Sequence, residues 1–282
     1  MFNNVIRPSI LGIFLNKYSK IEYDNKYLYL FIKNKKEESF SWREATGFVK
    51  INSGIFSSSI EFTFDSTPLK IDFLKKSDCK NSFNGINELL KNIIDERIIK
   101  KKNILHKYTQ LEYLRDSNVV TLENELLPLF NSYNNQREYW NKSLSIESCK
   151  FLNGYSEYFP LTEQSVQQLR EEFESKTLNN RSSFYDKIES NPLTEEQRLA
   201  VIRDNDRNLV LAAAGTGKTS VMVAKALDII DRGIAQAENI LILAYNKDAA
   251  KELQERLNLR GKDIFSDGNK KPQIKTFHAL GR

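Results

Sequence analysis

The chain has few of the residues that build disulfides and metal sites. Its 282 residues include two cysteines, Cys79 and Cys149, and two histidines, His106 and His278, all isolated from one another. Isolated cysteines and histidines exclude a disulfide-stapled secreted domain and a zinc-type cluster as the basis of the fold. We therefore predict a protein of a reducing compartment, the cytoplasm.

Long apolar runs are missing as well. No stretch approaches the roughly 20 apolar residues that a membrane-spanning helix requires. Near the N-terminus, Asn3, Asn4, Arg7 and Pro8 interrupt the run that a signal peptide would need. The sequence therefore predicts no membrane partner.

The charge is mildly basic, with a net charge of +5. This value is compatible with binding to nucleic acid but does not demonstrate it. The densest basic stretch has two interpretations: it contacts DNA phosphates, or it is the solvated face of a long helix, which is the commoner case. It consists of Arg97, Lys100, Lys101, Lys102 and Lys107.

The first part of the chain alternates in the manner of β-strands. Half-buried strands are predicted at Tyr27–Ile32, around Ile60–Phe64 and around Leu69–Phe73, and a helix from about Asn81 follows them. Antiparallel strands closed by one helix indicate a small module of pleckstrin-homology (PH)-like type over residues 1–97. Such a module more often binds a protein partner than performs chemistry, although nucleic acid is also possible.

Residues 98–190 have helical periodicity, with predicted divisions near Pro128 and at Phe159-Pro160. We expect a helical arm between the first module and the domain that follows. Its aromatic residues could stack on DNA, although packing in the core is the commoner use. They are Tyr133, Tyr139, Trp140, Tyr155, Tyr158 and Phe159.

The segment Ala212–Ser220, A-A-A-G-T-G-K-T-S, carries the most information about function. A glycine-rich loop that ends in Lys-Thr and opens a helix is built to hold a nucleoside triphosphate. Lys218 would reach the β- and γ-phosphates, and the Thr219 hydroxyl would bind Mg²⁺. Gly215 and Gly217 would allow the backbone to approach the phosphates without a Cβ. The first glycine of the usual pattern is replaced by Ala212.

The flanking residues support this interpretation over an ordinary glycine turn. Asn208–Leu211 is a short apolar run, typical of a buried parallel strand. After the loop, apolar residues recur at helical spacing from Val221 to Ile230, and Gly233 ends the pattern. Strand, glycine loop and helix are the arrangement that a phosphate-binding loop needs.

Three further segments flank this loop in a fixed order: Leu193–Val201 (LTEEQRLAV) upstream, then Leu241–Ala250 (LILAYNKDAA) and Thr276–Leu280 (TFHAL). With the loop, they resemble the Q motif and motifs I, Ia and Ib of UvrD/Rep-type superfamily 1 DNA helicases, most closely the helicase IV branch. The resemblance implies a partial α/β P-loop NTPase domain of RecA-like type over residues 191–282. The predicted fold class is therefore an α+β N-terminal module and a helical arm, followed by this partial domain.

The resemblance also implies cofactors, a partner and site residues. It implies ATP and Mg²⁺, binding to single-stranded DNA, and 3′→5′ translocation driven by ATP hydrolysis in the full-length enzyme. Gln197 would contact adenine, and aromatic residues after the loop would stack on bases. The implied nucleotide-binding residues are Gln197, Ala212, Ala213, Ala214, Gly215, Thr216, Gly217, Lys218, Thr219 and Ser220, with Lys218 and Thr219 catalytic. The implied DNA-binding residues are Tyr245, Asn246, Lys247, Thr276, Phe277 and His278.

Several of these residues also have structural explanations. Thr194-x-x-Gln197 is a helix capping box, a role that can coexist with adenine contact. Tyr245 could be a core aromatic residue, and His278 a structural histidine. Two positions depart from the family pattern. Ala213 stands where glycine is usual, and Asp248 stands where a basic residue is usual, which puts a DNA phosphate contact there in doubt unless Lys247 provides it.

The chain lacks the acidic pair and the arginine finger that phosphoryl transfer needs. Asp95 and Glu96 follow an apolar pair, but they lie in a helical pattern before the loop, and we reject them as that acidic pair. We expect the N-terminal part of a larger helicase, inactive by itself. The alternatives are a non-catalytic nucleotide-sensing or partner-binding protein and a helicase-like protein that remodels RNA polymerase. A phosphate-loop kinase is disfavoured by the Q-motif-like and TFHAL segments.

Overall fold

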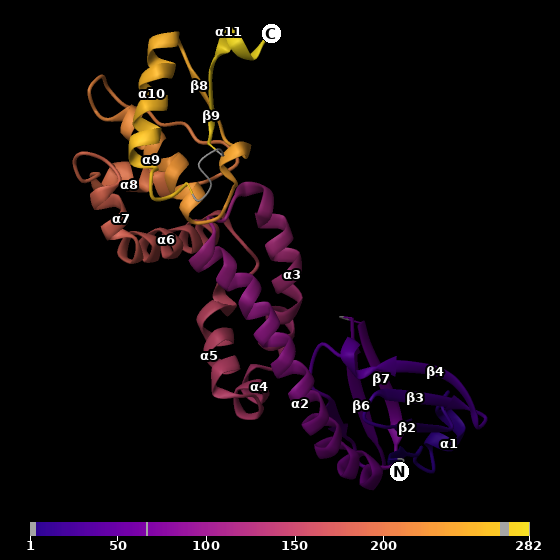
Figure 1. Ribbon diagram of the computed structural model, residues 1–282. Coiled ribbons are helices and arrows are strands. Elements are labelled where there is room, and N and C mark those ends of the chain that lie inside the picture. The colour runs from indigo at the N-terminus through magenta and orange to yellow at the C-terminus, as the bar shows by residue number, and fades with distance from the viewer. Residues whose placement is uncertain (1–3, 66, 266–270, 282) are drawn as a thin grey trace. The chain divides into compact units, whose positions relative to one another are not determined.

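The computed structural model describes residues 4–65, 67–265 and 271–281. Arg282, the last residue of the predicted nucleotide-binding domain, lies outside the described residues. Within them, antiparallel sheets and many helices give the predicted α+β mixture (Figure 1). None of the described helices combines the length and the apolar character needed to cross a membrane.

The chain divides into two compact units. Unit 1 comprises residues 1–105 and 120–162, and unit 2 comprises residues 106–119 and 163–282. Helix α3 (Asp116–Asn135) contributes residues to both units. The domain boundaries expected near residues 97 and 190 stay predictions.

Unit 1 begins with two antiparallel sheets. The predicted strand at Tyr27–Ile32 is present, and strands also cover the two other predicted regions. One sheet has the order β1-β2-β3-β4 and the other the order β5-β6-β7. The strands are β1 (Asn4–Ile6), β2 (Lys20–Tyr23), β3 (Tyr27–Ile32), β4 (Lys35–Ser41), β5 (Lys50–Ser53), β6 (Ser58–Phe64) and β7 (Thr67–Leu74), with the short helix α1 (Gly12–Leu15) after β1.

An aromatic cluster fills the space between the strands of unit 1. Trp42 is almost fully buried and lies against the rings of Tyr23, Phe62 and Phe64. Its indole N–H donates to the carbonyl of Asp24 at 2.8 Å, so its one polar atom is satisfied. Alternating burial along β6 matches a sheet with one face on this core.

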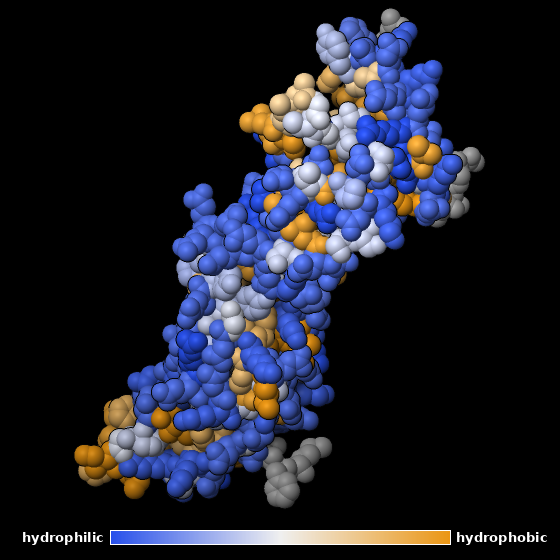
Figure 2. Space-filling model, turned by 90° about the vertical axis from the view of Figure 1, so that its left-hand side faces the viewer, coloured by the Kyte–Doolittle hydropathy of each residue, from blue (hydrophilic) through white to orange (hydrophobic). Residues whose placement is uncertain are grey.

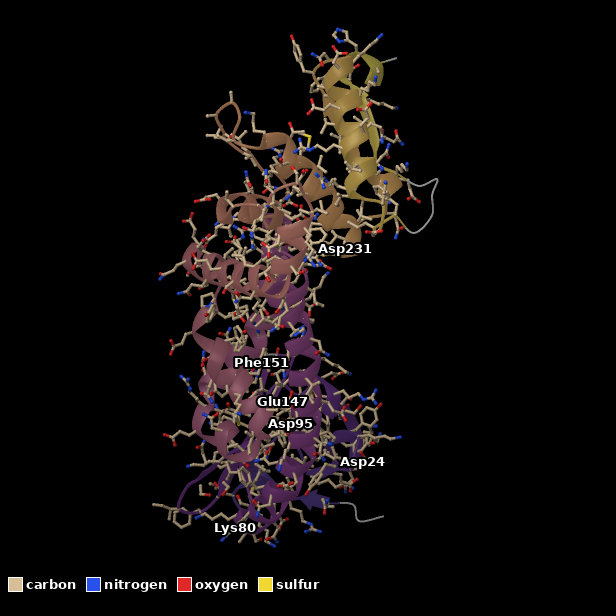
Figure 3. The ribbon with its side chains drawn as sticks, turned by 60° about the vertical axis from the view of Figure 1, so that its left-hand side comes forward. Asp24, Lys80, Asp95, Glu147, Phe151 and Asp231 are labelled. Atoms are coloured by element: carbon tan, nitrogen blue, oxygen red, sulfur yellow. The ribbon has the colours of Figure 1, made fainter. Side chains whose placement is uncertain are left out.

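Helix α2 (Lys76–His106) follows the second sheet and is the predicted closing helix. One of its faces is buried. Asp95 on α2 accepts hydrogen bonds from the backbone and the hydroxyl of Ser145, and Lys102 pairs with Glu147. Figure 3 shows Asp95 and Glu147 close together in this part of unit 1. The rejection of Asp95 and Glu96 as a catalytic pair is consistent with their position within this helix.

Three residues of the basic stretch interact with other groups of unit 1. The guanidinium of Arg97 donates to the carbonyls of Ala45 and Arg43, and burial lowers the pKa of this side chain. Lys101 and Lys102 form ion pairs with Glu125 and Glu147. Arg97 is therefore used inside the protein, whereas Lys101 and Lys102 lie at the surface beside these carboxylates. Contact of the stretch with DNA stays a prediction.

The remaining helices of unit 1 pack aromatic residues in its core. Tyr133 and Trp140 are fully buried and Phe159 nearly so, which confirms the core interpretation for these three. The division predicted at Pro128 is wrong, because Pro128 lies inside α3, whereas Phe159-Pro160 does separate helices. The helices are α4 (Arg137–Ser143) and α5 (Ile146–Tyr155), with a 3₁₀ turn at Ser156–Tyr158.

Unit 2 combines helices with a small parallel sheet. A π-helical turn, Lys107–Leu111, precedes the first turn of α3. Strands β8 (Leu241–Ala244) and β9 (Gln273–Thr276) pair in parallel, and α10 connects them. The helices are α6 (Glu163–Asn180), α7 (Ser182–Lys187), α8 (Glu195–Ile202), α9 (Lys218–Asp231), α10 (Lys247–Arg260) and α11 (Phe277–Leu280).

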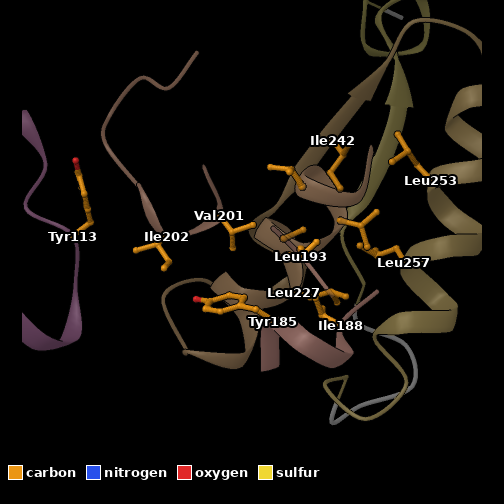
Figure 4. Close-up of a cluster of buried hydrophobic side chains, with 14 of the residues drawn as sticks. Tyr113, Tyr185, Ile188, Leu193, Val201, Ile202, Leu227, Ile242, Leu253 and Leu257 are labelled. Carbon is orange, nitrogen blue, oxygen red and sulfur yellow. The ribbon is translucent and has the colours of Figure 1, made fainter. Parts of the chain in front are cut away.

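The core of unit 2 joins α8, α9, α10 and β8 through aliphatic side chains, including Val201, Leu227, Ile242, Leu253 and Leu257 (Figure 4). Val201 and Ile242 lie in two of the segments that carry the helicase-like motifs, and the three leucines lie on the helices that follow two of these segments. The motif segments are therefore held to one another by a shared core.

A charge cluster anchors α9 within unit 2. Asp228 is 1% exposed and accepts hydrogen bonds from Arg181, Tyr185 and Arg232. Arg181 also pairs with Asp231, one turn later on α9. A buried carboxylate with this many donors is satisfied, and it fixes the position of the helix that follows the phosphate loop.

The surface carries scattered apolar side chains. On the face drawn in Figure 2, separate apolar patches interrupt a mostly hydrophilic surface. The most exposed large apolar residues include Ile10, Phe14, Ile55 and Phe56 in unit 1 and Leu209 and Leu211 in unit 2. In unit 1 these side chains form two local groups, one in and around α1 (residues 10–15) and one at Ile55-Phe56.

Candidate functional site

The site begins with the helix cap of α8. Thr194 is its N-cap residue, and its hydroxyl oxygen accepts the backbone N–H of Gln197 at 3.4 Å. In return, Gln197 Oε1 accepts the backbone N–H of Thr194 at 3.0 Å. This reciprocal pair confirms the predicted capping box. Beside it, hydrogen bonds from the backbone N–H of Glu196 and from the Thr194 hydroxyl lower the pKa of the Glu196 carboxyl.

The same glutamine also holds the phosphate loop. Gln197 Nε2 donates to the carbonyl of Thr216 at 3.0 Å, so one side chain joins the start of α8 to the loop. A primary amide has two donors and two lone pairs, and each polar atom of Gln197 makes one of these bonds. One N–H and one lone pair therefore stay available for a ligand such as the adenine edge.

Close contact with Gln197 explains the glycine at position 217. Gly217 has φ of +86°, and a Cβ placed on it would lie 2.6 Å from Gln197 Nε2. Gly215 also has a positive φ, +79°, but no atom lies within 4 Å of its would-be Cβ. Both positions have a left-handed backbone, which favours glycine, and at position 217 there is also no room for a side chain.

The side chain of Lys218 folds back onto the start of the loop. Lys218 Nζ donates to the carbonyls of Ala212 and Ala213, at 3.2 and 2.7 Å. The hydroxyl of Thr216 also donates to the carbonyl of Ala213, at 2.8 Å. The ammonium group therefore lies inside the curve of the loop, where phosphate oxygens could replace the two carbonyls.

Helix α9 starts immediately after the loop. Gly217 is its N-cap and makes no side-chain cap, so the free N–H groups of the first turn are available to an anion. Lys218, Thr219 and Ser220 form this first turn, with the last two half-buried. The predicted helix and its end near Gly233 are confirmed, since α9 runs to Asp231.

A cavity of about 890 Å³ brings these elements together within unit 2. Its lining includes Gln197 and most of the loop, but Ala214 and Thr219 are not among the lining residues. Two charged residues without a sequence motif, Glu189 and Arg256, also line it. The lining residues are Glu189, Ser190, Asn191, Pro192, Leu193, Thr194, Glu196, Gln197, Ala200, Val210, Leu211, Ala212, Ala213, Gly215, Thr216, Gly217, Lys218, Ser220, Val221 and Arg256.

The segment before the loop differs from its prediction. Asn208–Leu211 forms no strand, and Leu209 and Leu211 are 84% and 86% exposed, so the predicted buried strand is wrong here. A parallel strand requires hydrogen-bonded neighbours, and β8 and β9, the strands described in unit 2, pair with one another and not with this segment. The apolar pattern was therefore insufficient to determine the pairing.

The residues of the Ia- and Ib-like segments meet at one edge of the small sheet. Ala244, the last residue of β8, lies opposite Thr276, the last residue of β9. Tyr245 and Phe277 each follow one of these positions directly, so the two aromatic residues leave neighbouring strand ends. The carboxyl edge of parallel strands is the edge at which α/β folds bind ligands.

Exposure distinguishes the interpretations of these residues. Tyr245 is 87% exposed, which rules out a core role, and Phe277 is 61% exposed. His278 is exposed, so it is not a buried structural histidine. Asn246 and Thr276 act as N-caps, accepting from the backbone N–H groups of Ala249 and Ala279.

The acidic residue at position 248 has a local explanation. Asp248 lies in the first turn of α10, where a carboxylate interacts favourably with the helix dipole. Lys247, beside it, is exposed on the same turn. The six predicted DNA-binding residues do not line the cavity described above. Among the described residues, no group of three His, Cys, Asp or Glu side chains is placed to hold a metal ion by itself.

Comparison with known proteins identifies relatives of the last third of the chain. Residues 193–282 match the UvrD/REP helicase N-terminal domain family. The chain is 42% identical over 105 residues to DNA helicase IV of Escherichia coli (strain K12) and 42% identical over 66 residues to a probable DNA helicase II homolog of Rickettsia conorii. It is also 39% identical over 66 residues to DNA helicase II of Rickettsia typhi.

These matches cover limited parts of each protein. They include 36%, 23% and 23% of this chain, and 14%, 10% and 10% of the three relatives. They confirm the predicted resemblance to UvrD/Rep-type helicases for the part of the chain in which the four motifs lie.

Proposed function

We propose that this chain is the N-terminal part of an ATP-dependent DNA helicase or translocase, with ATP bound in the cavity beside α9. The observation that carries the proposal is the position of Gln197, which caps α8 and holds the carbonyl of Thr216 in the phosphate loop. An adenine-reading residue and a phosphate loop must contact the same nucleotide, and this hydrogen bond holds Gln197 beside the loop. The matches to helicases over the same residues support the assignment.

The chemistry of the loop fits a triphosphate with Mg²⁺. Lys218 and the first-turn N–H groups of α9 would hold the phosphates, and the Thr219 hydroxyl would be the protein ligand of the metal. Bound Mg²⁺ would neutralise phosphate charge and orient the γ-phosphoryl group. The lysine already contacts two carbonyl oxygens, so it can exchange these for phosphate oxygens without moving far.

The carboxyl edge of β8 and β9 is the proposed surface for single-stranded DNA. Tyr245 and Phe277 leave this edge side by side in the sheet and are both exposed. Exposed aromatic faces stack on bases without sequence preference, as a translocase requires. Asn246, Lys247, Thr276 and His278 surround them, and Lys247 supplies a cation for a phosphate. Movement in the 3′→5′ direction and inactivity of this chain alone are parts of the same proposal.

We also propose a fold type for a part of each unit. Seven strands in sheets of four and three, closed by α2, support a PH-like module for the first part of unit 1. The parallel β8–α10–β9 connection with α9 packed on α10 supports a RecA-like domain. A PH-like module would bind a protein partner of the helicase.

The nucleotide proposal is tested by titration with a fluorescent ATP analogue and Mg²⁺. We expect binding by the wild-type chain and a loss of at least about tenfold in affinity for Lys218→Ala, since a phosphate would lose a charge-assisted hydrogen bond. Lys251→Ala is the matched control, because Lys251 is an exposed lysine on α10. Equal affinities for all three proteins would contradict the proposal.

The DNA proposal is tested by fluorescence anisotropy with a labelled single-stranded oligonucleotide. Tyr245→Ala and Phe277→Ala should each weaken binding by about tenfold, the effect expected for the loss of one stacked base. Phe56→Ala removes an aromatic side chain in unit 1 that is at least as exposed as that of Phe277 and should leave the affinity unchanged. If Phe56→Ala had the same effect as the other two, the proposed surface would be wrong.

A further inference from the structure

Glu189 is a buried carboxylate that no helicase-like motif includes. It lies between α7 and α8, and its side chain is 3% exposed. Glu189 Oε2 accepts hydrogen bonds from Nε and Nη2 of Arg256, at 3.3 and 3.1 Å. Among the described residues, its other oxygen, Oε1, has no hydrogen-bond partner. Burial of a carboxylate is costly, so its retention beside a cavity calls for a reason.

Arg256 carries this interaction to the phosphate-binding helix. Its Nη2 also donates to Ser220 Oγ at 2.9 Å. Ser220 directly follows Lys218 and Thr219 in the first turn of α9. The three residues therefore form a chain from Glu189 on the α8 side, through Arg256 on α10, to the helix turn that begins the phosphate site. All three line the same cavity.

A second arginine on α10 also pairs with Glu189 and serves as a comparison for Arg256. Arg260 lies one helical turn after Arg256, and its Nε is 3.7 Å from Glu189 Oε2. Its side chain is as exposed as that of Arg256, 27% against 28%. Within the described part of the chain, Arg260 does not line the cavity, and the hydrogen bond to Ser220 comes from Arg256 instead. Both arginines therefore pair with Glu189, and the hydrogen bond to Ser220 is what distinguishes Arg256 from Arg260.

We propose that Glu189 is a positioning residue of the nucleotide pocket, which holds the Arg256 guanidinium against Ser220 and so fixes the first turn of α9. A guanidinium suits this role because its planar set of donors can bond a carboxylate and a hydroxyl at once. Fixing Ser220 also fixes the backbone N–H groups and the side chains of Lys218 and Thr219 next to it. The proposal rests on the proposed function, because it assumes that nucleotide phosphates bind at this turn.

The experiment measures the affinity of a fluorescent ADP analogue for the wild-type chain and for Glu189→Gln, Ser220→Ala and the double variant. We expect each single variant to bind about tenfold more weakly, as for the loss of one hydrogen bond to a charged group. The double variant should bind no more weakly than the single variants, because both changes interrupt one connection. Arg260→Gln is the matched control and should bind as the wild type does.

The outcomes separate this inference from the proposed function. If Glu189→Gln and Ser220→Ala bind like the wild type while Lys218→Ala does not bind, the inference is overturned and the nucleotide site stands. Additive losses in the double variant, or an equal loss in Arg260→Gln, also overturn it, because they indicate general loosening of the fold. If the wild type and Lys218→Ala do not differ, both proposals fall. Should Glu189→Gln fail to fold, an unchanged affinity in Ser220→Ala overturns the inference by itself.

Discussion

Replacing Gly217 by alanine should damage the phosphate loop more than the same change at Gly215. Both glycines have similar positive φ values, +86° and +79°, so both alanines carry the same kind of backbone strain. The surroundings differ, since a Cβ at position 217 would lie 2.6 Å from Gln197 Nε2, and one at position 215 meets nothing within 4 Å. The comparison therefore isolates the contact between the loop and Gln197.

The magnitudes follow from the contacts that each variant loses. A left-handed alanine costs about 1 kcal/mol, and this is the full effect expected for Gly215→Ala. In Gly217→Ala the amide end of the flexible Gln197 side chain must also shift, which breaks its hydrogen bond to the carbonyl of Thr216. Such a bond is worth about 1 kcal/mol, so the total should be about 2 kcal/mol.

The assay is urea unfolding followed by far-ultraviolet circular dichroism, with tryptophan fluorescence as an internal control. Both tryptophans, Trp42 and Trp140, belong to unit 1, so their fluorescence transition should not change in either variant. Gln197→Ala should cost less when added to Gly217→Ala than when made alone, because the bond to Thr216 is already lost. Equal losses in Gly215→Ala and Gly217→Ala, or full additivity with Gln197→Ala, would show that the contact with Gln197 does not distinguish the two glycines.

Three further predictions concern stability and reactivity. Asp228→Asn should lower the free energy of unfolding of unit 2 by about 1–3 kcal/mol in a denaturant titration, since it removes the buried charge on which the half-buried Arg181 and Arg232 converge, although Arg181 keeps its pair with Asp231; an unchanged free energy of unfolding would contradict this. The hydrogen bond from Arg170 lowers the pKa of Asp116 in the folded state below its ordinary value of 3.8. The ionised carboxylate therefore stabilises the fold fully above pH 3.8, and this stabilisation is lost as the pH falls through the folded-state pKa. Asp116→Asn should therefore reduce stability at neutral pH and remove part of the acid dependence, and an unchanged acid profile would count against it. Burial raises the pKa of both thiols, that of Cys79 to about 12, but Cys149 is partly exposed and Cys79 is buried. Iodoacetamide should therefore label Cys149 slowly in the native protein and reach Cys79 only after unfolding, as mass spectrometry of the labelled peptides can check.

Local sequence patterns predicted the parts of the fold whose stabilising contacts are near in sequence. The capping box at Thr194 and Gln197 and the end of α9 near Gly233 are present because the interacting groups lie within one or two helical turns. The strand at Tyr27–Ile32 is present because its alternation fits a sheet with one buried face.

Features that depend on distant partners were not predictable in the same way. Asn208–Leu211 has the composition of a buried strand, but a strand also needs neighbours, which the apolar run cannot specify. Pro128 was expected to divide two helices, yet α3 continues through it. Tertiary packing offsets the local penalty of a proline when both flanking turns are buried against other elements.

Within the site, the motifs identified one part of the pocket and missed another. Gln197 and the loop residues stand in recognisable patterns, and the structure joins them. Glu189 and Arg256 are separated by 67 residues, and no spacing rule connects two such positions. The one available signal was the spacing of Arg256 and Arg260, which places both on one face of α10.

Calorimetric titration with ATP and with GTP, in the presence of Mg²⁺, will decide whether the cavity beside α9 is an ATP site in which Gln197 contacts adenine. We expect tighter binding of ATP than of GTP, loss of this preference in Gln197→Ala, and loss of binding to both nucleotides in Lys218→Ala. Absence of nucleotide binding in the folded wild-type chain, or binding that Lys218→Ala leaves unchanged, would contradict this assignment.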